Sequence, residues 1–358
     1  MPHMFVPGPV DVDPEVLQAQ TLAMIPHRSK EFETLYRQVE EKSRLLFNTD
    51  FRVFLAAASG SGLQEAAVRN FVKEKVLVCI NGAFAERWYE VAVSNGKQVD
   101  RIDAAWDQPI TAGMIPEKMR GKGYESILLV HNETSTGLQN PVKEIASAAR
   151  EVSPNTLICV DTVSSLGGVK IEMDEWGLDM VLSSSQKCLA LPPGLALGAV
   201  SDRALEYAQG VPDRGWYFDL VRMEKHRLKD STPATPAMSL IYALDYQLDR
   251  ILNEGLENRY KRHESMSKRV QDWALDRGLS LFAPEGFRSH TVTTVKNEKG
   301  WDISELNKYL LQKEMRIANG YGPLKGKTFR IAHMGETKLE DVERLLQTME
   351  EFMGAGTG

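Results

Sequence analysis

Between Phe51 and Val200 the chain alternates short runs rich in aliphatic and β-branched residues with longer amphipathic stretches. Seven of these runs have the composition of strands, and they begin at Phe51, Lys75, Gln98, Ser126, Thr156, Asp179 and Leu195. A helix-bearing connection between strands is typical of parallel pairing, because parallel neighbours need a crossover. The sequence therefore predicts an α/β fold with a seven-stranded, mainly parallel sheet sandwiched by helices.

The pattern changes after about residue 200, where helical segments dominate. The last hundred residues alternate long amphipathic helices with only two or three strands, which indicates a second, smaller α+β domain. We predict an N-terminal arm at residues 1–16, a large domain at residues 17–255 and a small C-terminal domain at residues 256–358.

Composition excludes several classes of function. The 43 basic and 49 acidic residues are mixed along the chain, so no basic block favours nucleic acid as a partner. No segment approaches the roughly 18 apolar residues that cross a bilayer, and the first residues lack a secretory pattern, so we expect a cytoplasmic protein. The three cysteines, Cys79, Cys159 and Cys188, are too few for a disulfide framework and lack the spacing of a metal site.

Polar residues that follow the strands are the candidates for a functional site, because ligands of open α/β sheets bind at the carboxyl ends of the strands. Residues 59–62 read Ser-Gly-Ser-Gly between a strand and a helix, where glycines and free backbone N–H groups favour an anion such as phosphate. An ordinary turn is the alternative for this segment. Asp161 ends a very apolar strand and needs a cation, donors or a protonated ring nitrogen, unless it caps the segment that follows.

Three further segments contain candidate residues for the functional site. Lys187 stands in an apolar loop, and desolvation lowers the pKa of an amine, as a lysine that attacks a carbonyl requires. Residues 131–137 form a dense run of hydrogen-bonding groups after the strand that begins at Ser126. Arg330 lies in a predicted strand near the C-terminus and could bind a carboxylate through two parallel hydrogen bonds. Considered alone, it would be interpreted as a surface residue.

Taken in order, these segments resemble the pyridoxal-phosphate enzymes of fold type I, and more closely the class V aminotransferases that act as alanine:glyoxylate and serine:glyoxylate (or serine:pyruvate) aminotransferases. The resemblance covers nearly the whole chain and rests on FVPGPVDVDPEVL, SGSGLQEAA, NGAFAERW, HNETSTGLQNP, VDTVSSLGG, SSSQKCLALPPGLA, TPAMSLIYAL and FRIAHMG. It implies pyridoxal 5′-phosphate as the cofactor, bound in the large domain, and a homodimer with active sites at the subunit interface. No metal is implied.

The resemblance also implies roles for individual residues. Lys187 would form the Schiff base with the cofactor and move the proton, and Asp161 would pair with the pyridine nitrogen. Phe84 would stack on the ring, Thr134 would meet the phenolic oxygen, and Arg330 would bind the substrate's α-carboxylate. The other implied positions are Ser61, Gly62, Leu63 and Gln186 around the phosphate, Thr235 from the neighbouring subunit, and Pro7, Gly8 and Pro9 beside the substrate. Leu63 departs from the family, which commonly has Thr or His there.

The leading functional hypothesis is an aminotransferase that moves an amino group from alanine or serine to glyoxylate or pyruvate by a ping-pong route. It is motivated by the single carboxylate-binding arginine and the lack of an obvious second cationic site. His27, Arg28 and Arg222 are the basic residues that could meet a second acidic group.

Several alternatives stay open at this stage. A class V transaminase for aspartate, 2-aminoethylphosphonate or ureidoglycine would use the same motifs. A class V lyase such as a cysteine desulfurase is disfavoured, because no cysteine follows Cys188. A non-catalytic protein that keeps the fold is disfavoured by the presence of both Asp161 and Lys187.

Overall fold

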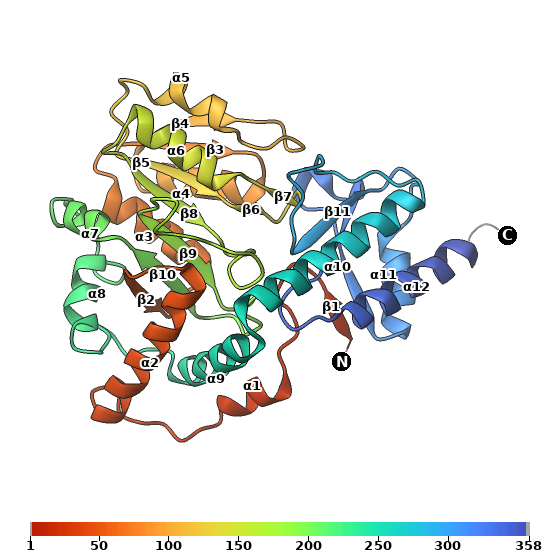
Figure 1. Cartoon of the computed structure of the whole chain (residues 1–358), viewed down its shortest axis with the longest axis horizontal. Coiled ribbons are helices and arrows are strands. Elements are labelled where there is room, and N and C mark those ends of the chain that lie inside the picture. Colours follow the sequence, from red (N-terminus) through yellow and green to blue (C-terminus); the bar gives the residue numbers. More distant parts are fainter. Residues whose placement is uncertain (1, 356–358) are drawn as a thin grey trace.

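The computed structural model describes residues 2–355 and contains the predicted seven-stranded sheet. The strand order is β2-β10-β9-β8-β5-β3-β4 (Figure 1). The strands are β2 (Arg52–Ala56), β3 (Lys75–Ile80), β4 (Gln98–Asp103), β5 (Ser126–Val130), β8 (Leu157–Asp161), β9 (Met180–Ser184) and β10 (Ala196–Val200). Only β10 runs antiparallel to its neighbours, β2 and β9, so the prediction of a mainly parallel sheet is confirmed.

Helices cover both faces of this sheet. Successive residues of a strand point to opposite faces, so apolar residues along one strand contribute to two separate cores. In β8, Ile158 faces one core and Cys159 faces the other, and both are fully buried. One face packs against α3 (Gly60–Phe71), α4 (Ala83–Ser94), α7 (Asp202–Gln209) and α8 (Leu220–Arg227). The other packs against α1 (Pro14–Ala19), α2 (Lys30–Phe47), α5 (Ile115–Met119), α6 (Val142–Val152) and α9 (Met238–Glu254). Burial on both faces explains why most of the strands are largely apolar runs, whereas β4, at one edge of the sheet, is polar and only partly buried.

A second sheet of four strands has the order β1-β12-β13-β11. It consists of β1 (His3–Phe5), β11 (Val292–Lys296), β12 (Met315–Asn319) and β13 (Thr328–Ala332), and it packs with α10 (Leu256–Asp276), α11 (Ile303–Gln312) and α12 (Leu339–Ala355). The first strand was not expected, yet β1 pairs in parallel with β12. The N-terminus therefore lies among C-terminal elements (Figure 1).

The connections of the large sheet bring the candidate residues to one edge. Strands β2, β5, β8 and β9 all run in the same direction, because β10 is antiparallel to both β2 and β9. Their carboxyl ends lead into the segment that begins at Ser59, the run from His131, the loop after Asp161 and the loop that contains Lys187. A two-stranded ribbon, β6 (Asn132–Glu133) and β7 (Leu138–Gln139), shapes the second of these connections.

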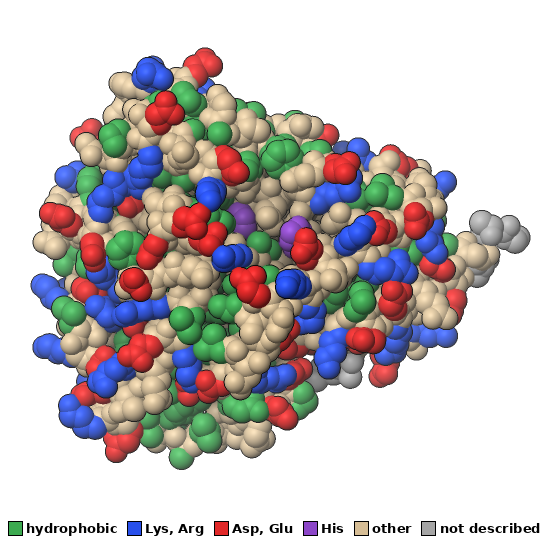
Figure 2. Space-filling model, viewed as in Figure 1, with side chains coloured by type: hydrophobic (Ala, Val, Ile, Leu, Met, Phe, Trp, Pro, Cys, Tyr) green, Lys and Arg blue, Asp and Glu red, His purple; other side chains and the backbone are tan. Residues whose placement is uncertain are grey.

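Charged side chains of both signs are interspersed over the face of the molecule in Figure 2. This agrees with the mixed charge pattern of the sequence. None of the helices in the described part of the chain is both long and apolar enough to span a membrane.

Candidate functional site

A cavity of about 210 Å³ lies where the carboxyl ends of these strands meet. Its walls include Ser61, Phe84, Thr134, Asp161, Gln186 and Lys187, all of which were predicted as site residues. The remaining lining residues are Ser59, Gly60, Gln64, Arg87, Val130, Asn132, Val163, Ser164 and Ser184. Much of the wall is polar, so the cavity suits a polar ligand.

Lys187 reaches the cavity from the loop after β9 and is almost fully buried. Its amine donates a hydrogen bond to the carbonyl of Pro7, so the N-terminal segment covers it. The backbone of Gly8 has a φ of +90°, and a Cβ there would lie 2.6 Å from Cδ of Lys187. Burial, reinforced by the charge of Arg330 and more weakly of Arg87, lowers the pKa of Lys187 to about 8, although Cys188 and Asp161 act in the opposite direction.

Asp161 faces the same cavity from the end of β8. One carboxylate oxygen accepts a hydrogen bond from Nε2 of Gln64 at 2.7 Å, and the other accepts from the backbone N–H of Val163 at 2.8 Å. Among the described residues it forms no ion pair, and burial raises its pKa to about 6. The carboxylate therefore fixes the turn after the strand and also remains available to a cationic ligand group.

A buried glutamate orients the helix that carries Phe84. The carboxylate of Glu133, which has no exposed surface, accepts hydrogen bonds from the backbone N–H groups of Phe84 at 3.1 Å and Ala85 at 3.0 Å. It also accepts from the hydroxyl and N–H of Ser135. Burial raises the pKa of Glu133, while these hydrogen bonds lower it. Glu133 thus satisfies the first turn of α4 from outside the helix.

Arg330 lies in β13, beside the cavity rather than in its wall. Its guanidinium donates to the backbone carbonyls of Thr134 and Asn319, each at 3.1 Å, and lies 5.5 Å from the ring centroid of Tyr321. Burial lowers the pKa of Arg330 to about 10. No carboxylate in the described chain forms an ion pair with it, which leaves the charge available to an anionic substrate.

Arg87 also lines the cavity, although it was not among the residues predicted from the sequence. Its guanidinium donates to the hydroxyl of Tyr321 at 3.2 Å and lies 4.9 Å from the ring centroid of Phe84. Helical spacing could have revealed it, because residues three apart on α4 share a face, and Phe84 was already a candidate. The same spacing relates Gln64 to Ser61 on α3.

Several other predicted residues lie outside the cavity wall. The side chain of Leu63 is fully buried in the core beneath the sheet, and a Cβ on Gly62 would lie 2.9 Å from the ring of Phe218. Thr235 is exposed and lines a separate hollow with Tyr217. Pro9 borders a groove beside β12 and is not among the residues that line the cavity.

Two of the basic residues suggested for a second acidic group also have other contacts. Arg28 donates to the carbonyl of Thr232 at 2.8 Å, and Arg222 lies over the ring of Trp216. His27 is likewise not among the residues that line the cavity.

The comparisons with known proteins agree on one family. Residues 15–345 match the family model described as aminotransferase class-V. An uncharacterized aminotransferase of Methanocaldococcus jannaschii is 38% identical over 97% of this chain and 91% of its own length. The L-aspartate–glyoxylate aminotransferase of Paracoccus denitrificans is 33% identical over 93% of this chain and 86% of its own.

A solved structure supports the same conclusion. The alanine–glyoxylate aminotransferase from Nostoc sp. matches with a TM-score of 0.93 and 30% identity, covering 98% of this chain and 95% of that one. The fold is that of the fold type I aminotransferases, and the cofactor is pyridoxal 5′-phosphate.

The cavity fits this cofactor. Four buried side-chain atoms in its wall have no hydrogen-bond partner among the described residues: Oε1 of Gln64, Oδ1 of Asn132, Oγ of Ser184 and Oε1 of Gln186. Buried polar atoms are rarely left unpaired, so these atoms indicate a polar ligand. The loop around Ser59 and the start of α3 offer hydroxyls and backbone N–H groups to a phosphate, and Asp161 offers a carboxylate to a protonated ring nitrogen.

Covalent attachment of pyridoxal phosphate to the cofactor-free protein should accelerate as the pH rises through about 8 and level off above it, because Lys187 would attack the aldehyde only as the neutral amine. Replacing Arg330 with Gln removes a positive charge that lowers this pKa, so the midpoint should move to higher pH. Mixing the protein with cofactor at a series of pH values and following absorbance measures both profiles.

Arg316→Gln is the control, because this exposed arginine lies on β12 of the same sheet. It should leave the midpoint unchanged. A wild-type midpoint near the ordinary lysine pKa of about 10.4 would contradict the burial argument.

Proposed function

Because the chain belongs to the class V aminotransferase family, we propose that it transfers the amino group of L-alanine or L-serine to glyoxylate or pyruvate by a ping-pong route. The observation that carries this proposal is the guanidinium of Arg330, buried without a carboxylate partner among the described residues and near enough to Lys187 to lower its pKa. It would hold the α-carboxylate common to all these substrates.

Pyridoxal phosphate supplies the carbonyl carbon that accepts the amino group and the ring that accepts electrons from the substrate's Cα. Lys187 would hold the cofactor and then, as a neutral amine, take the proton from Cα. Its lowered pKa supports this role, since a protonated amine could not accept a proton. Asp161 would keep the ring nitrogen protonated through its carboxylate, and that ion pair would in turn lower the raised pKa of Asp161.

The remaining residues would bind and orient. Phe84 would lie against the cofactor ring, held there by the hydrogen bonds between Glu133 and the start of α4. Ser61 and Gln186 would contact the phosphate, and Thr134 the phenolic oxygen. The segment at Pro7 and Gly8 would exclude water from the amine of Lys187, which it already covers.

We propose that the enzyme is a homodimer in which Thr235 reaches the phosphate site of the partner subunit. Within one subunit Thr235 lies in a hollow apart from the cavity. The surface nearby includes the exposed side chains of Trp216 and Tyr217, and exposed aromatic residues favour a protein interface.

A class V lyase that uses a reactive cysteine is not supported. Cys188 is fully buried, and burial raises its pKa to about 12, so its thiol is neither accessible nor ionised near neutral pH. No cysteine follows it in the chain.

Adding L-alanine or L-serine to the holoenzyme without an acceptor should convert the cofactor to its amino form and release pyruvate or hydroxypyruvate. Glyoxylate should then restore the original spectrum and appear as glycine. Arg330→Gln should lower kcat/KM for either donor by at least roughly 30-fold, because the α-carboxylate loses its charged partner. Absorbance titration and chromatography of the products measure these outcomes.

The control for this test is again Arg316→Gln, which should behave like the wild type. A holoenzyme whose spectrum stays unchanged with alanine, serine and aspartate would rule out the proposed activity.

A second candidate donor is aspartate, and Arg87 is the observation that favours it. The lack of a second cationic site motivated the choice of alanine and serine, but Arg87 lines the cavity and forms no ion pair with a described residue. Arg87 and Arg330 both contact Tyr321, so two guanidinium groups share one site. They could hold both carboxylates of aspartate, which would become oxaloacetate while glyoxylate becomes glycine. A phosphonate, as in 2-aminoethylphosphonate, would also suit Arg87, whereas nothing in the site favours ureidoglycine.

Arg87→Gln should lower kcat/KM for aspartate by at least roughly 30-fold while changing that for alanine by less than about threefold, because only aspartate has a second carboxylate to lose its partner. Steady-state kinetics with each donor and glyoxylate measure the ratio. Tyr321→Phe is the matched control: it removes the hydroxyl that Arg87 contacts but keeps the charge, so the preference should persist. Equal losses for both donors in Arg87→Gln would exclude a role for Arg87 in donor choice.

A further inference from the structure

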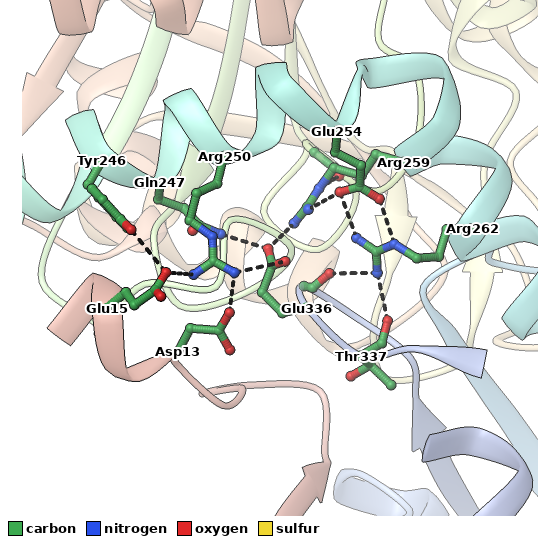
Figure 3. A network of polar contacts seen from close by, with 12 residues as sticks. Asp13, Glu15, Tyr246, Gln247, Arg250, Glu254, Arg259, Arg262, Glu336 and Thr337 are labelled. Carbon is green, nitrogen blue, oxygen red and sulfur yellow. Dashed lines mark hydrogen bonds and ion pairs between the residues drawn. The ribbon is translucent and has the colours of Figure 1, made fainter. Parts of the chain in front are cut away.

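Arg259 is an arginine of α10 whose side chain is almost completely buried. Its guanidinium donates to the carbonyl of Gly167 and to the carbonyl of Cys188, each at 2.8 Å. It also pairs with Glu254 at 2.8 Å and with Glu336 at 2.9 Å (Figure 3). Four of the five N–H groups of the side chain are thus directed at protein acceptors.

Three of these acceptors belong to the segments that carry the proposed catalytic and substrate-binding groups. Gly167 lies in the loop that follows Asp161, and Cys188 is the residue after Lys187. Glu336 lies in the turn that follows β13, the strand of Arg330. One guanidinium therefore joins three connections that come from two different sheets.

These segments also pack directly against one another. A Cβ on Gly335, whose φ is +68°, would lie 2.9 Å from Cβ of Ala190 in the lysine loop. A Cβ on Gly168 would lie 2.9 Å from Sγ of Cys188 and 3.1 Å from the ring of His263 on α10. The close approach leaves little freedom for one segment to move without the others.

The same network reaches the N-terminal segment that covers Lys187. Glu336 accepts a hydrogen bond from Gln247 at 2.7 Å and lies 3.9 Å from Arg250. Arg250 in turn pairs with Asp13, which follows the covering residues Pro7 and Gly8 along the chain (Figure 3). Ion pairs and hydrogen bonds therefore connect the turn after β13 with Asp13, five residues beyond Gly8 of the segment that covers the amine.

We propose that Arg259 is a positioning residue, which fixes Lys187 relative to Asp161 and Arg330 by binding the backbone behind Lys187, the loop after Asp161 and the turn after Arg330. The planar guanidinium can serve all three acceptors at once, whereas a lysine ammonium in its place would lack that fixed fork. Small displacements of a catalytic group are costly to the rate, so the proposed consequence concerns turnover more than binding. The inference rests on the proposed role of Lys187.

The test compares Arg259→Lys and Glu336→Gln with the wild-type holoenzyme. Arg259→Lys should lower kcat by about 100-fold and leave KM for the amino donor within about threefold, because the substrate's own contacts remain. It should also move the midpoint for covalent attachment of pyridoxal phosphate to higher pH, since a looser loop admits water to the amine. Glu336→Gln keeps the shape of the side chain and should shift both quantities in the same direction by a smaller factor.

Glu343→Gln is the matched control, because Glu343 pairs with Arg269 of the same helix α10 but with none of the three segments. It should leave kcat and the midpoint unchanged. Thermal denaturation of each variant fixes an assay temperature at which all are folded. If Arg259→Lys is too unstable to purify, Glu336→Gln alone decides the matter.

The outcomes separate the two proposals. If wild-type protein never attaches the cofactor covalently, the proposed function fails. If it does, and both variants lose only thermal stability while kcat and the attachment midpoint stay at wild-type values, Arg259 has a purely structural role and the inference is overturned.

Discussion

The removal of water from the amine of Lys187 is the constraint on which the rest of the site depends. A solvated lysine would be protonated at neutral pH and could neither attack an aldehyde nor accept a proton from carbon. Here the covering segment at Pro7 and Gly8, the nearby charge of Arg330 and the apolar loop around the lysine act together to lower its pKa to about 8. Because the cover comes from the N-terminal segment and Arg330 from β13, the pKa of Lys187 depends on segments from both ends of the chain.

Two buried charged groups position the site without lining the space where substrate would bind. Glu133 holds the start of α4, and therefore Phe84 and Arg87, from one side. Arg259 joins the segments after Asp161, Lys187 and Arg330 from the other. Buried charges are costly unless they are fully paired, and each of these two meets several partners. Glu133 and Arg259 both bind the backbone of segments that carry proposed site residues, which supports the positioning role proposed for Arg259.

The sheet and much of the cavity wall could be predicted from sequence because their signals are local. Most strands of the large sheet are apolar runs bounded by polar residues, with β4 the polar exception, and the topology of parallel strands sends the following loops to one edge. Contacts between residues that are far apart in the sequence have no comparable local pattern. The pairing of β1 with β12 joins residues from opposite ends of the chain, and the partners of Arg259 are distant in sequence. Arg87 differs from these, since its spacing of three residues from Phe84 on α4 is a local signal that places both side chains on one face of the helix.

The central claim is that Lys187 is the residue that binds the cofactor, and it can be tested directly by reducing the holoenzyme with borohydride and mapping the modified peptide by mass spectrometry. The account predicts one stable pyridoxyl adduct, on the peptide that contains Lys187, and its loss in Lys187→Ala. An adduct on a different lysine, or a chromophore that reduction leaves untouched, would contradict the assignment and with it the roles given to Asp161 and Arg330.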